Sequence, residues 1–525
     1  MMRWMAGFVI ALSSVAVPVT GAAAPDGHSH GHGKPVVGAR SLGDPLLPQL
    51  GNGGYDATHY TIELDYDPVA NRFDAAKTTI TALASSKLRE FSLDFQDDLD
   101  LMSVKVNGRK AGFHFEEATP QLSDDPVVTQ PMKLVVTPRP STRPKAGRAF
   151  TVVVRYHGTP HEITDPDTSI EGWIQACFPL NAPRTCDGAF VVNEPMGAQS
   201  WFPSNNYPTD KATFDTSITV PNSKTALGVG ELVSRTDNGD GTTTWQWRED
   251  DPTATYLTTA TVGDFIYTQG SMEETSTGRT LPVYNAIDST ATTGQLTSIN
   301  NALSRAPAQI NFLSSVYGPY PFDSTGAVAD RAAGVGYALE VQTKPHYSGG
   351  FTSGDPSIGV GTQLHELSHQ WVGNSVTLAT WSDIWLNEGW ANWTEWYWQF
   401  RQNGGANPAD IFDDLYANTP AGDWATAPTI LDGDPAKLFE FFPTYQRGAL
   451  TVEGYREIVG DDVFFTFTKA IQREFAHGNL STAEFIDRAV DASGLAGGQR
   501  TLLEQFFQQW LYGEAKPSIL PDAFV

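Results

Sequence analysis

The segment His365-Glu366-Leu367-Ser368-His369 constrains this chain more than any other part of its sequence. Two histidines at positions i and i+4 lie on one face of a helix, where both imidazoles can reach a single metal ion. Catalytic zinc sites use three protein ligands and leave one position open for water. Glu366, beside the first histidine, can act as the general base that takes a proton from that water. The pattern predicts a helix over residues 363–372 that carries part of a catalytic zinc site.

A second predicted helix, over residues 385–400, supplies a candidate for the third ligand. The segment is rich in aromatic residues, which indicates a buried helix, and Glu388 lies near its start. A carboxylate in an apolar helix is costly unless it is paired or binds a metal. Glu395 lies two turns further along the same face. We expect Glu395 to orient one ligand histidine through its other ring nitrogen; a surface position is the alternative.

Together with Trp385-Leu386-Asn387-Glu388-Gly389, the histidine motif resembles the gluzincin aminopeptidases, the family of aminopeptidase N and of the bifunctional leukotriene hydrolase. The resemblance covers roughly residues 50–515. It implies one zinc ion per chain, held by His365, His369 and Glu388, with Glu366 as the general base. It also implies peptide substrates with a free N-terminus, from which the enzyme removes the first residue.

The segment Tyr337-Ala338-Leu339-Glu340-Val341 resembles the family's Gly-Ala-Met-Glu-Asn strand. Ala338 and Glu340 are kept, while the other three positions differ. In the family this glutamate binds the substrate ammonium, so the resemblance assigns substrate binding to Ala338 and Glu340. The residues from Leu339 to Lys344 predict a short strand, to whose edge an extended peptide could add.

Two further segments match the family in the expected order. Glu194 precedes Phe202-Pro203 and Lys211-Ala212-Thr213-Phe214, as a Gln or Glu that contacts the substrate amine does in the family. Tyr445 precedes Arg447-Gly448, which resembles the Tyr-x-Lys-Gly stretch whose tyrosine stabilises the oxyanion. Without the resemblance, Glu194 would be a solvated loop residue and Tyr445 a core or rim residue.

Alternative functions remain open at this level. A zinc endopeptidase or an epoxide hydrolase of the same fold would use the same metal site, and a non-catalytic zinc-binding relative would keep only the ligands. Many family members continue into a small β-domain and a large helical domain. On length alone, neither is expected within these 525 residues.

Strand and helix patterns divide the chain. Alternating apolar residues and turn pairs such as Asp240-Gly241 predict an all-β domain over residues 48–265. Helix-period apolar residues follow, beginning with residues 294–317, and predict a mainly helical domain over 266–525. The predicted fold class is therefore α+β and multidomain. The resemblance implies a saddle-like β domain followed by a thermolysin-like zinc catalytic domain.

The N-terminus predicts export. Residues 1–24 combine Arg3, an apolar run and a small-residue stretch, as a cleaved signal peptide does. Residues 25–47, with several histidines, glycines and prolines, are predicted to be a flexible leader. In an exported chain, Cys177 and Cys186 predict a disulfide. The protein is therefore expected to be secreted, without stable membrane insertion after cleavage.

The charge of the chain excludes one class of partner. It has 34 basic and 60 acidic side chains, a formal net charge of −26, whereas nucleic-acid binding requires a basic surface. We therefore expect no nucleic acid as a partner. Nothing in the sequence indicates an oligomeric state.

Overall fold

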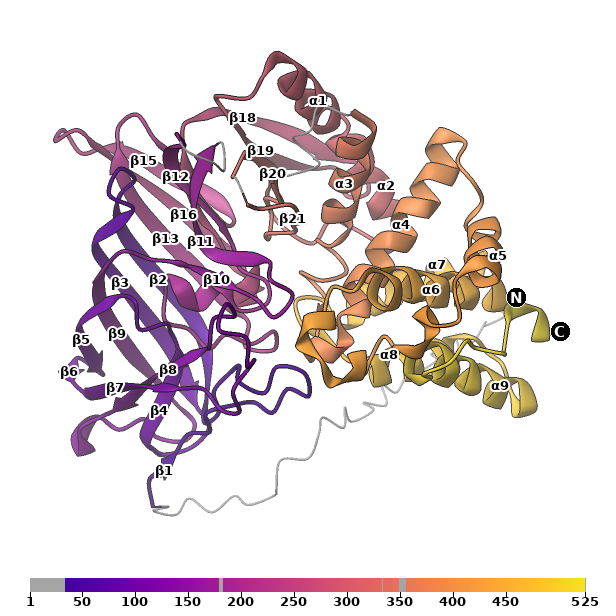
Figure 1. Ribbon diagram of the computed structural model, residues 1–525, viewed down its shortest axis with the longest axis horizontal. Coiled ribbons are helices and arrows are strands. Elements are labelled where there is room, and N and C mark those ends of the chain that lie inside the picture. The colour runs from indigo at the N-terminus through magenta and orange to yellow at the C-terminus, as the bar shows by residue number, and fades with distance from the viewer. Residues whose placement is uncertain (1–33, 179–182, 333, 349–355, 525) are drawn as a thin grey trace, which may run out of the picture. The chain divides into compact units, whose positions relative to one another are not determined.

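The computed structural model describes residues 34–178, 183–332, 334–348 and 356–524. The predicted signal peptide and the leader histidines lie outside these residues. Strands make up the first half of the chain, and a small sheet followed by helices makes up the second (Figure 1). The predicted fold class is thereby confirmed.

The β part contains three sheets. Its largest sheet has eight strands in the order β15-β16-β13-β2-β3-β9-β5-β6. In β2, Tyr60, Ile62, Leu64 and Tyr66 are buried while alternate residues are more exposed, because successive strand residues point to opposite faces. The strands of this sheet are β2 (Tyr55–Asp67), β3 (Arg72–Ala84), β5 (Asp100–Val106), β6 (Arg109–Lys110), β9 (Arg148–Gly158), β13 (Ala212–Pro221), β15 (Glu231–Asp237) and β16 (Thr242–Thr253).

Two smaller sheets complete the β part. The four-stranded sheet comprises β1 (Val36–Val37), β4 (Leu88–Asp94), β8 (Met132–Thr137) and β7 (Gly112–Glu117). The five-stranded sheet comprises β10 (Glu162–Thr164), β11 (Ile170–Phe178), β12 (Thr185–Val192), β17 (Ala260–Gly263) and β14 (Thr225–Gly228). Cys177 and Cys186 pair across β11 and β12 and form the predicted disulfide.

The prediction of a flexible leader is wrong for its last part, residues 34–47. β1 pairs with β4, and Leu47 is buried. Asp44 explains the order of this segment. Its Oδ1 accepts hydrogen bonds from the backbone N–H groups of Leu46 and Leu47, both at 2.8 Å, and its Oδ2 accepts one from Trp381 N, also at 2.8 Å. The segment therefore packs against the helical part, a contact that no local pattern reveals.

A five-stranded sheet begins the second half of the chain, where the sequence predicted mainly helices. Its order is β18-β19-β20-β22-β21. The sequence pattern identified only β21, and the structure limits that strand to two residues, after which a turn at Thr343 has positive φ. The strands are β18 (Phe265–Glu274), β19 (Arg279–Asp288), β20 (Thr325–Ala329), β21 (Ala338–Leu339) and β22 (His346–Tyr347).

The helices predicted over residues 363–372 and 385–400 form with shifted ends, over Pro356–Ser368 and Trp385–Asn403. The apolar pattern over 294–317 forms two helices, because Pro307 has no N–H to donate and begins a new helix. None of the described helices is both long and apolar enough to cross a bilayer. The helices are α1 (Thr293–Leu303), α2 (Ala306–Tyr317), α3 (Pro356–Ser368), α4 (Trp385–Asn403), α5 (Pro408–Asn418), α6 (Arg447–Val459), α7 (Asp461–Glu474), α8 (Thr482–Ala492) and α9 (Gly497–Phe507).

Lys211 joins the β part to the segments that follow α3 and α7. Its Nζ donates to the carbonyl oxygens of Asn374, Ser375 and Gly478 at 2.9, 3.0 and 2.8 Å. An ammonium has three donors, so all three are used. This contact fixes the chain just beyond the histidine helix against the β part.

Candidate active site

Helices α3 and α4 bring the three candidate metal ligands together. His365 Nε2 lies 3.0 Å and His369 Nε2 3.5 Å from Glu388 Oε2. The ligand atoms of these three residues all lie within 4.8 Å of one another. α3 ends earlier than predicted, at Ser368, but the hydrogen bond from His369 N to His365 O keeps His369 one turn beyond His365. Two imidazoles and one carboxylate form a donor set of catalytic zinc, and their convergence here fits that metal.

The other ring nitrogen of each histidine is held by an acceptor. His365 Nδ1 donates to Glu395 Oε1 at 2.7 Å, and His369 Nδ1 donates to the carbonyl oxygen of Val372 at 3.0 Å. Protonation at Nδ1 leaves the Nε2 lone pair available for a metal. The structure thus places Glu395 in contact with a ligand histidine, where an orienting residue would lie.

The charges around the ligands favour a cation. Burial lowers the pKa of His369, but the carboxylates of Glu388 and Glu340 more than offset this and raise it to about 9. Burial raises the pKa of Glu388, but the neighbouring imidazoles lower it to about 2. A buried group of carboxylates with this much attraction for positive charge is suited to hold a divalent ion.

Glu366 and Glu340 both lie close to His369. Their carboxylate oxygens and a ring nitrogen of His369 lie within 4.8 Å of one another. Glu340 is 2% exposed, and its Oε1 has no hydrogen-bond partner among the described residues. Gln370 and Asn374 donate to its backbone carbonyl at 3.1 and 2.7 Å. Residues just past the histidine motif therefore hold the backbone of Glu340, which directly follows β21.

Glu194 lies on the loop between β12 and the short helix Gly197–Ser200, and its carboxylate lines the same cavity as Glu340. Burial, then the charge of Glu340, raises the pKa of Glu194. Glu171 at the start of β11 accepts a hydrogen bond from Met196 N at 2.9 Å and so supports this loop. Sequence reasoning missed Glu171, since nothing in its local sequence distinguishes it from an ordinary strand residue.

Tyr445 also lines this cavity. It lies in the π-helix Phe441–Gln446, and its ring stacks against that of His365 at 6.1 Å between centroids. Arg447, two residues later and fully buried, anchors this segment. Its guanidinium donates to five carbonyl oxygens, those of Trp424, Thr426, Gln509, Trp510 and Gly513.

Two glycines allow close contact between α4, which carries Glu388, and α6, which follows Tyr445. A Cβ built on Gly448 of α6 would lie 2.8 Å from Gly389 Cα, and one built on Gly389 of α4 would lie 2.7 Å from the Gly448 backbone. Real Cβ atoms do not approach backbone so closely, so neither position accepts a side chain without a shift. Gly389, which follows Glu388, and Gly448, which follows Arg447, therefore set the distance between Glu388 and Tyr445.

We expect Gly448→Ala to lower both stability and activity. The added methyl group must separate α4 from α6, and overpacking of this kind costs about 1–3 kcal/mol. The separation also moves Tyr445 relative to Glu388. Gly294→Ala in α1 is the control, because nothing lies within 4 Å of its built Cβ. Denaturant unfolding and kcat/KM of both variants test this; an unchanged Gly448→Ala would contradict the proposed contact.

The predicted site residues face one cavity of about 340 Å³. Ala338 lies in its wall with the metal ligands, the two ammonium-binding candidates, Glu366, Glu395 and Tyr445. Tyr337, one of the positions at which the Tyr337–Val341 segment departs from the family strand, also lines the cavity. The sequence did not identify the rest of the wall, which comes from separate loops and helices: Asp167, Ser169, Thr362 and Phe439.

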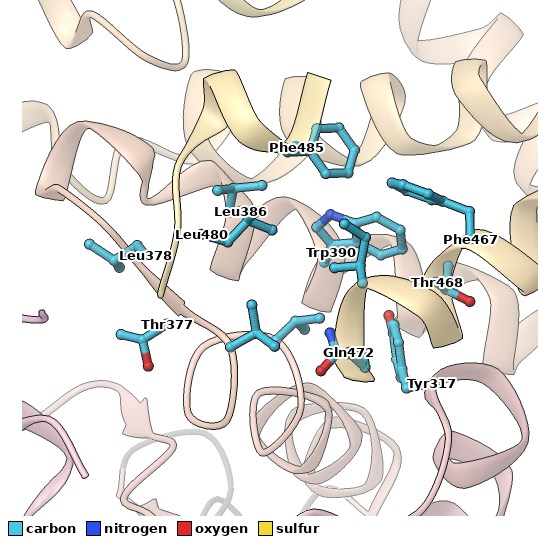
Figure 2. Close-up of a pocket in the computed structure, with 13 residues that line it drawn as sticks. Tyr317, Thr377, Leu378, Leu386, Trp390, Phe467, Thr468, Gln472, Leu480 and Phe485 are labelled. Carbon is cyan, nitrogen blue, oxygen red and sulfur yellow. The ribbon is translucent and has the colours of Figure 1, made fainter. Parts of the chain in front are cut away.

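A second cavity lies on the other face of α4, in the helical core (Figure 2). Leu386, Trp390 and Phe485 line it, and its volume is about 20 Å³. This is room for about one water molecule, so the cavity is a packing void. The opposite face of α4 carries Glu388 and Glu395, which line the cavity of about 340 Å³. That cavity is therefore the candidate site.

Two family models match the chain. The N-terminal domain of M1 peptidases matches residues 56–257, and the peptidase family M1 domain matches residues 360–510. The chain belongs to the M1 peptidase family. Its M1 peptidase domain contains His365, His369 and Glu388, and zinc is the cofactor that the family and this donor set indicate.

Named relatives in the M1 family are aminopeptidases. Aminopeptidase M1 of Arabidopsis thaliana is 26% identical over 60% of this chain and 36% of its own length. Bovine aminopeptidase N is 28% identical over 56% of this chain and 32% of its own length. The chain thus spans about a third of the length of these relatives.

A solved M1 structure matches almost over its whole length. The M1 zinc metallopeptidase from Deinococcus radiodurans superposes with a TM-score of 0.75, covering 91% of this chain and 99% of that chain. Its sequence is 24% identical, so the likeness shows the shared two-part fold.

Proposed function

We propose that this chain is a zinc-dependent aminopeptidase that removes the first residue from peptides with a free N-terminus. The position of Glu340 carries the proposal: this buried carboxylate lies within 4.8 Å of His369 and Glu366, and its Oε1 has no hydrogen-bond partner among the described residues. An α-ammonium bound by Glu340 and Glu194 would set the first peptide bond beside the metal ligands. An endopeptidase has no use for such charge at this place.

Each group of residues in the site has its own role in the proposed reaction. His365, His369 and Glu388 would hold zinc, which when bound polarises a carbonyl and acidifies water. Glu366 takes a proton from the attacking water and delivers it to the leaving amine. Tyr445 donates a hydrogen bond to the oxyanion that develops on the scissile carbonyl. Glu194 and Glu340 bind the α-ammonium, so that cleavage follows the first residue.

A panel of aminoacyl arylamides, assayed with and without a chelator, tests the proposal. We expect hydrolysis of several amides, its loss on metal removal and its return with zinc. Activity that survives complete metal removal would overturn the zinc mechanism. A zinc-loaded protein that hydrolyses none of the amides would instead favour a binding protein.

Tyr445→Phe is expected to lower kcat by about 10²–10³-fold while KM changes little, because the lost hydrogen bond forms mainly in the transition state. Tyr416→Phe is a matched control: its hydroxyl donates to the carbonyl oxygen of Pro517 at 2.6 Å, outside the cavity lining. Steady-state kinetics of both variants measure the effect. If Tyr445→Phe behaved like Tyr416→Phe, Tyr445 would not bind the oxyanion.

We also propose that the protein is secreted. The signal-like residues 1–24 and the disulfide between Cys177 and Cys186 support export to an oxidising compartment. N-terminal sequencing of protein expressed with its own N-terminus tests this. We expect the exported protein to begin just after residues 22–24, whereas an intact Met1 on intracellular protein would contradict it.

A further inference from the structure

The proposed mechanism leaves one part of the cavity wall without a role. The metal ligands, Glu366 and Tyr445 face the scissile bond, while Glu194 and Glu340 face the α-ammonium. Apart from Ala338 and Glu395, the remaining wall is formed by Asp167, Ser169, Tyr337, Thr362 and Phe439. In a substrate held at both its ammonium and its first carbonyl, the side chain of the first residue must point to this remaining wall. The composition of this wall therefore decides which N-terminal residue is accepted.

Asp167 lies on a tight turn between β10 and β11. Asp165 N donates to the carbonyl oxygen of Ser169 at 2.9 Å and closes the turn. Asp167 Oδ1 accepts hydrogen bonds from Ser169 N at 2.9 Å and from Ser169 Oγ at 2.6 Å. Its Oδ2 accepts none from the residues that the structure describes, and Asp167 has no ion-pair partner there. An exposed carboxylate with one free oxygen is thus held at the cavity wall.

Tyr337 fixes this turn to the second half of the chain. Its hydroxyl donates to the carbonyl oxygen of Ile170, the first residue of β11, at 2.7 Å. Tyr337 directly precedes β21, and Glu340 directly follows it, so this hydrogen bond joins the turn to the segment that carries Glu340. The hydroxyl of Tyr337 is used by this hydrogen bond, and the residue also lines the cavity. An aromatic ring beside a carboxylate suits a planar cation.

The charge of the cavity also favours a positively charged first side chain. Among the described lining residues there is no lysine or arginine, and Asp167 is the acid that neither the metal site nor the ammonium site uses. Zinc and the α-ammonium would offset the charge of the deeper carboxylates. A second positive charge, on the first side chain, would pair with Asp167.

We propose that Asp167 is a specificity-determining residue that selects substrates with arginine or lysine at the N-terminus. The inference rests on the proposed aminopeptidase function. Arginine is favoured over lysine, because a planar guanidinium can pair with the free Oδ2 of Asp167 and also stack on the ring of Tyr337, which an ammonium cannot do.

The test compares kcat/KM for arginyl, lysyl, leucyl, alanyl and glutamyl arylamides with zinc-loaded protein. For the unaltered chain we expect arginyl and lysyl amides to lead by about tenfold and the glutamyl amide to be poorest. Asp167→Asn should lower kcat/KM by about tenfold for the two cationic amides and leave the leucyl and alanyl amides within about twofold.

Asp240→Asn provides a matched control. Asp240 Oδ1 accepts hydrogen bonds from Thr242 N and Thr242 Oγ1 at 3.0 and 2.6 Å, as Asp167 does from Ser169, but Asp240 lies outside the cavity lining. This variant should leave all five amides unchanged. An equal loss on every amide in Asp167→Asn, or an unaltered chain without cationic preference, would overturn the inference. Failure to hydrolyse any amide would instead remove the proposed function itself.

Discussion

Glu366→Gln is expected to lower kcat/KM by about 10²–10⁴-fold while zinc stays bound. Glutamine has nearly the same shape as glutamate but cannot take a proton from water. Glu366 is not one of the three proposed zinc ligands, His365, His369 and Glu388, so the metal should remain. The loss should fall on kcat, because proton transfer belongs to the chemical step.

Zinc content and kinetics of the same Glu366→Gln preparation separate the two effects. Glu273→Gln on β18 serves as a control, since Glu273 is exposed and lies outside the cavity lining. A zinc-loaded Glu366→Gln variant with nearly full activity would show that another group is the base. Loss of zinc in this variant would show that Glu366 contributes to metal binding.

N-acetylated peptides are expected to be poorer substrates than the free peptides by about 10³–10⁵-fold, a range typical of sites built around a substrate polar group. Acetylation removes the α-ammonium and leaves the carboxylates of Glu194 and Glu340 buried without a partner. Glu340 is 2% exposed, so water cannot readily replace the lost charge.

Glu340→Gln should reduce the preference for free peptides over N-acetylated peptides, because the variant binds the α-ammonium less well. The variant should raise KM for free peptides more than it lowers kcat, because the interaction anchors the ground state as well as the transition state. The ratio of kcat/KM for free and acetylated forms of one peptide measures the effect in both proteins. Equal cleavage of both forms by the unaltered chain would identify an endopeptidase and reject the aminopeptidase assignment.

Local sequence spacing predicted the residues that share one helix. His365 and His369 are four apart, and Glu388 and Glu395 are seven apart, so helical geometry alone places each pair on one face. The structure brings the two faces together and puts Glu395 against His365. The family resemblance was needed for Glu194, Glu340 and Tyr445, whose sequence neighbours give no chemical signal.

Features that depend on contacts between distant segments could not be predicted. Asp167 and Phe439 reach the same cavity from turns far apart in the chain, and no periodic pattern connects them. Residues 34–47 have the composition of a linker, yet Asp44 binds the backbone of Trp381 and orders them. Strands as short as β21 and β22 lack enough residues to show a period of two.

The metal content of the purified chain tests the central claim most directly. Elemental analysis should find about one zinc ion per chain in the active protein, because the ligand atoms of His365, His369 and Glu388 form one converging donor set. Glu388→Gln should lose that zinc and the hydrolytic activity together. An active preparation without stoichiometric metal, or a Glu388→Gln variant that keeps both zinc and activity, would contradict the account.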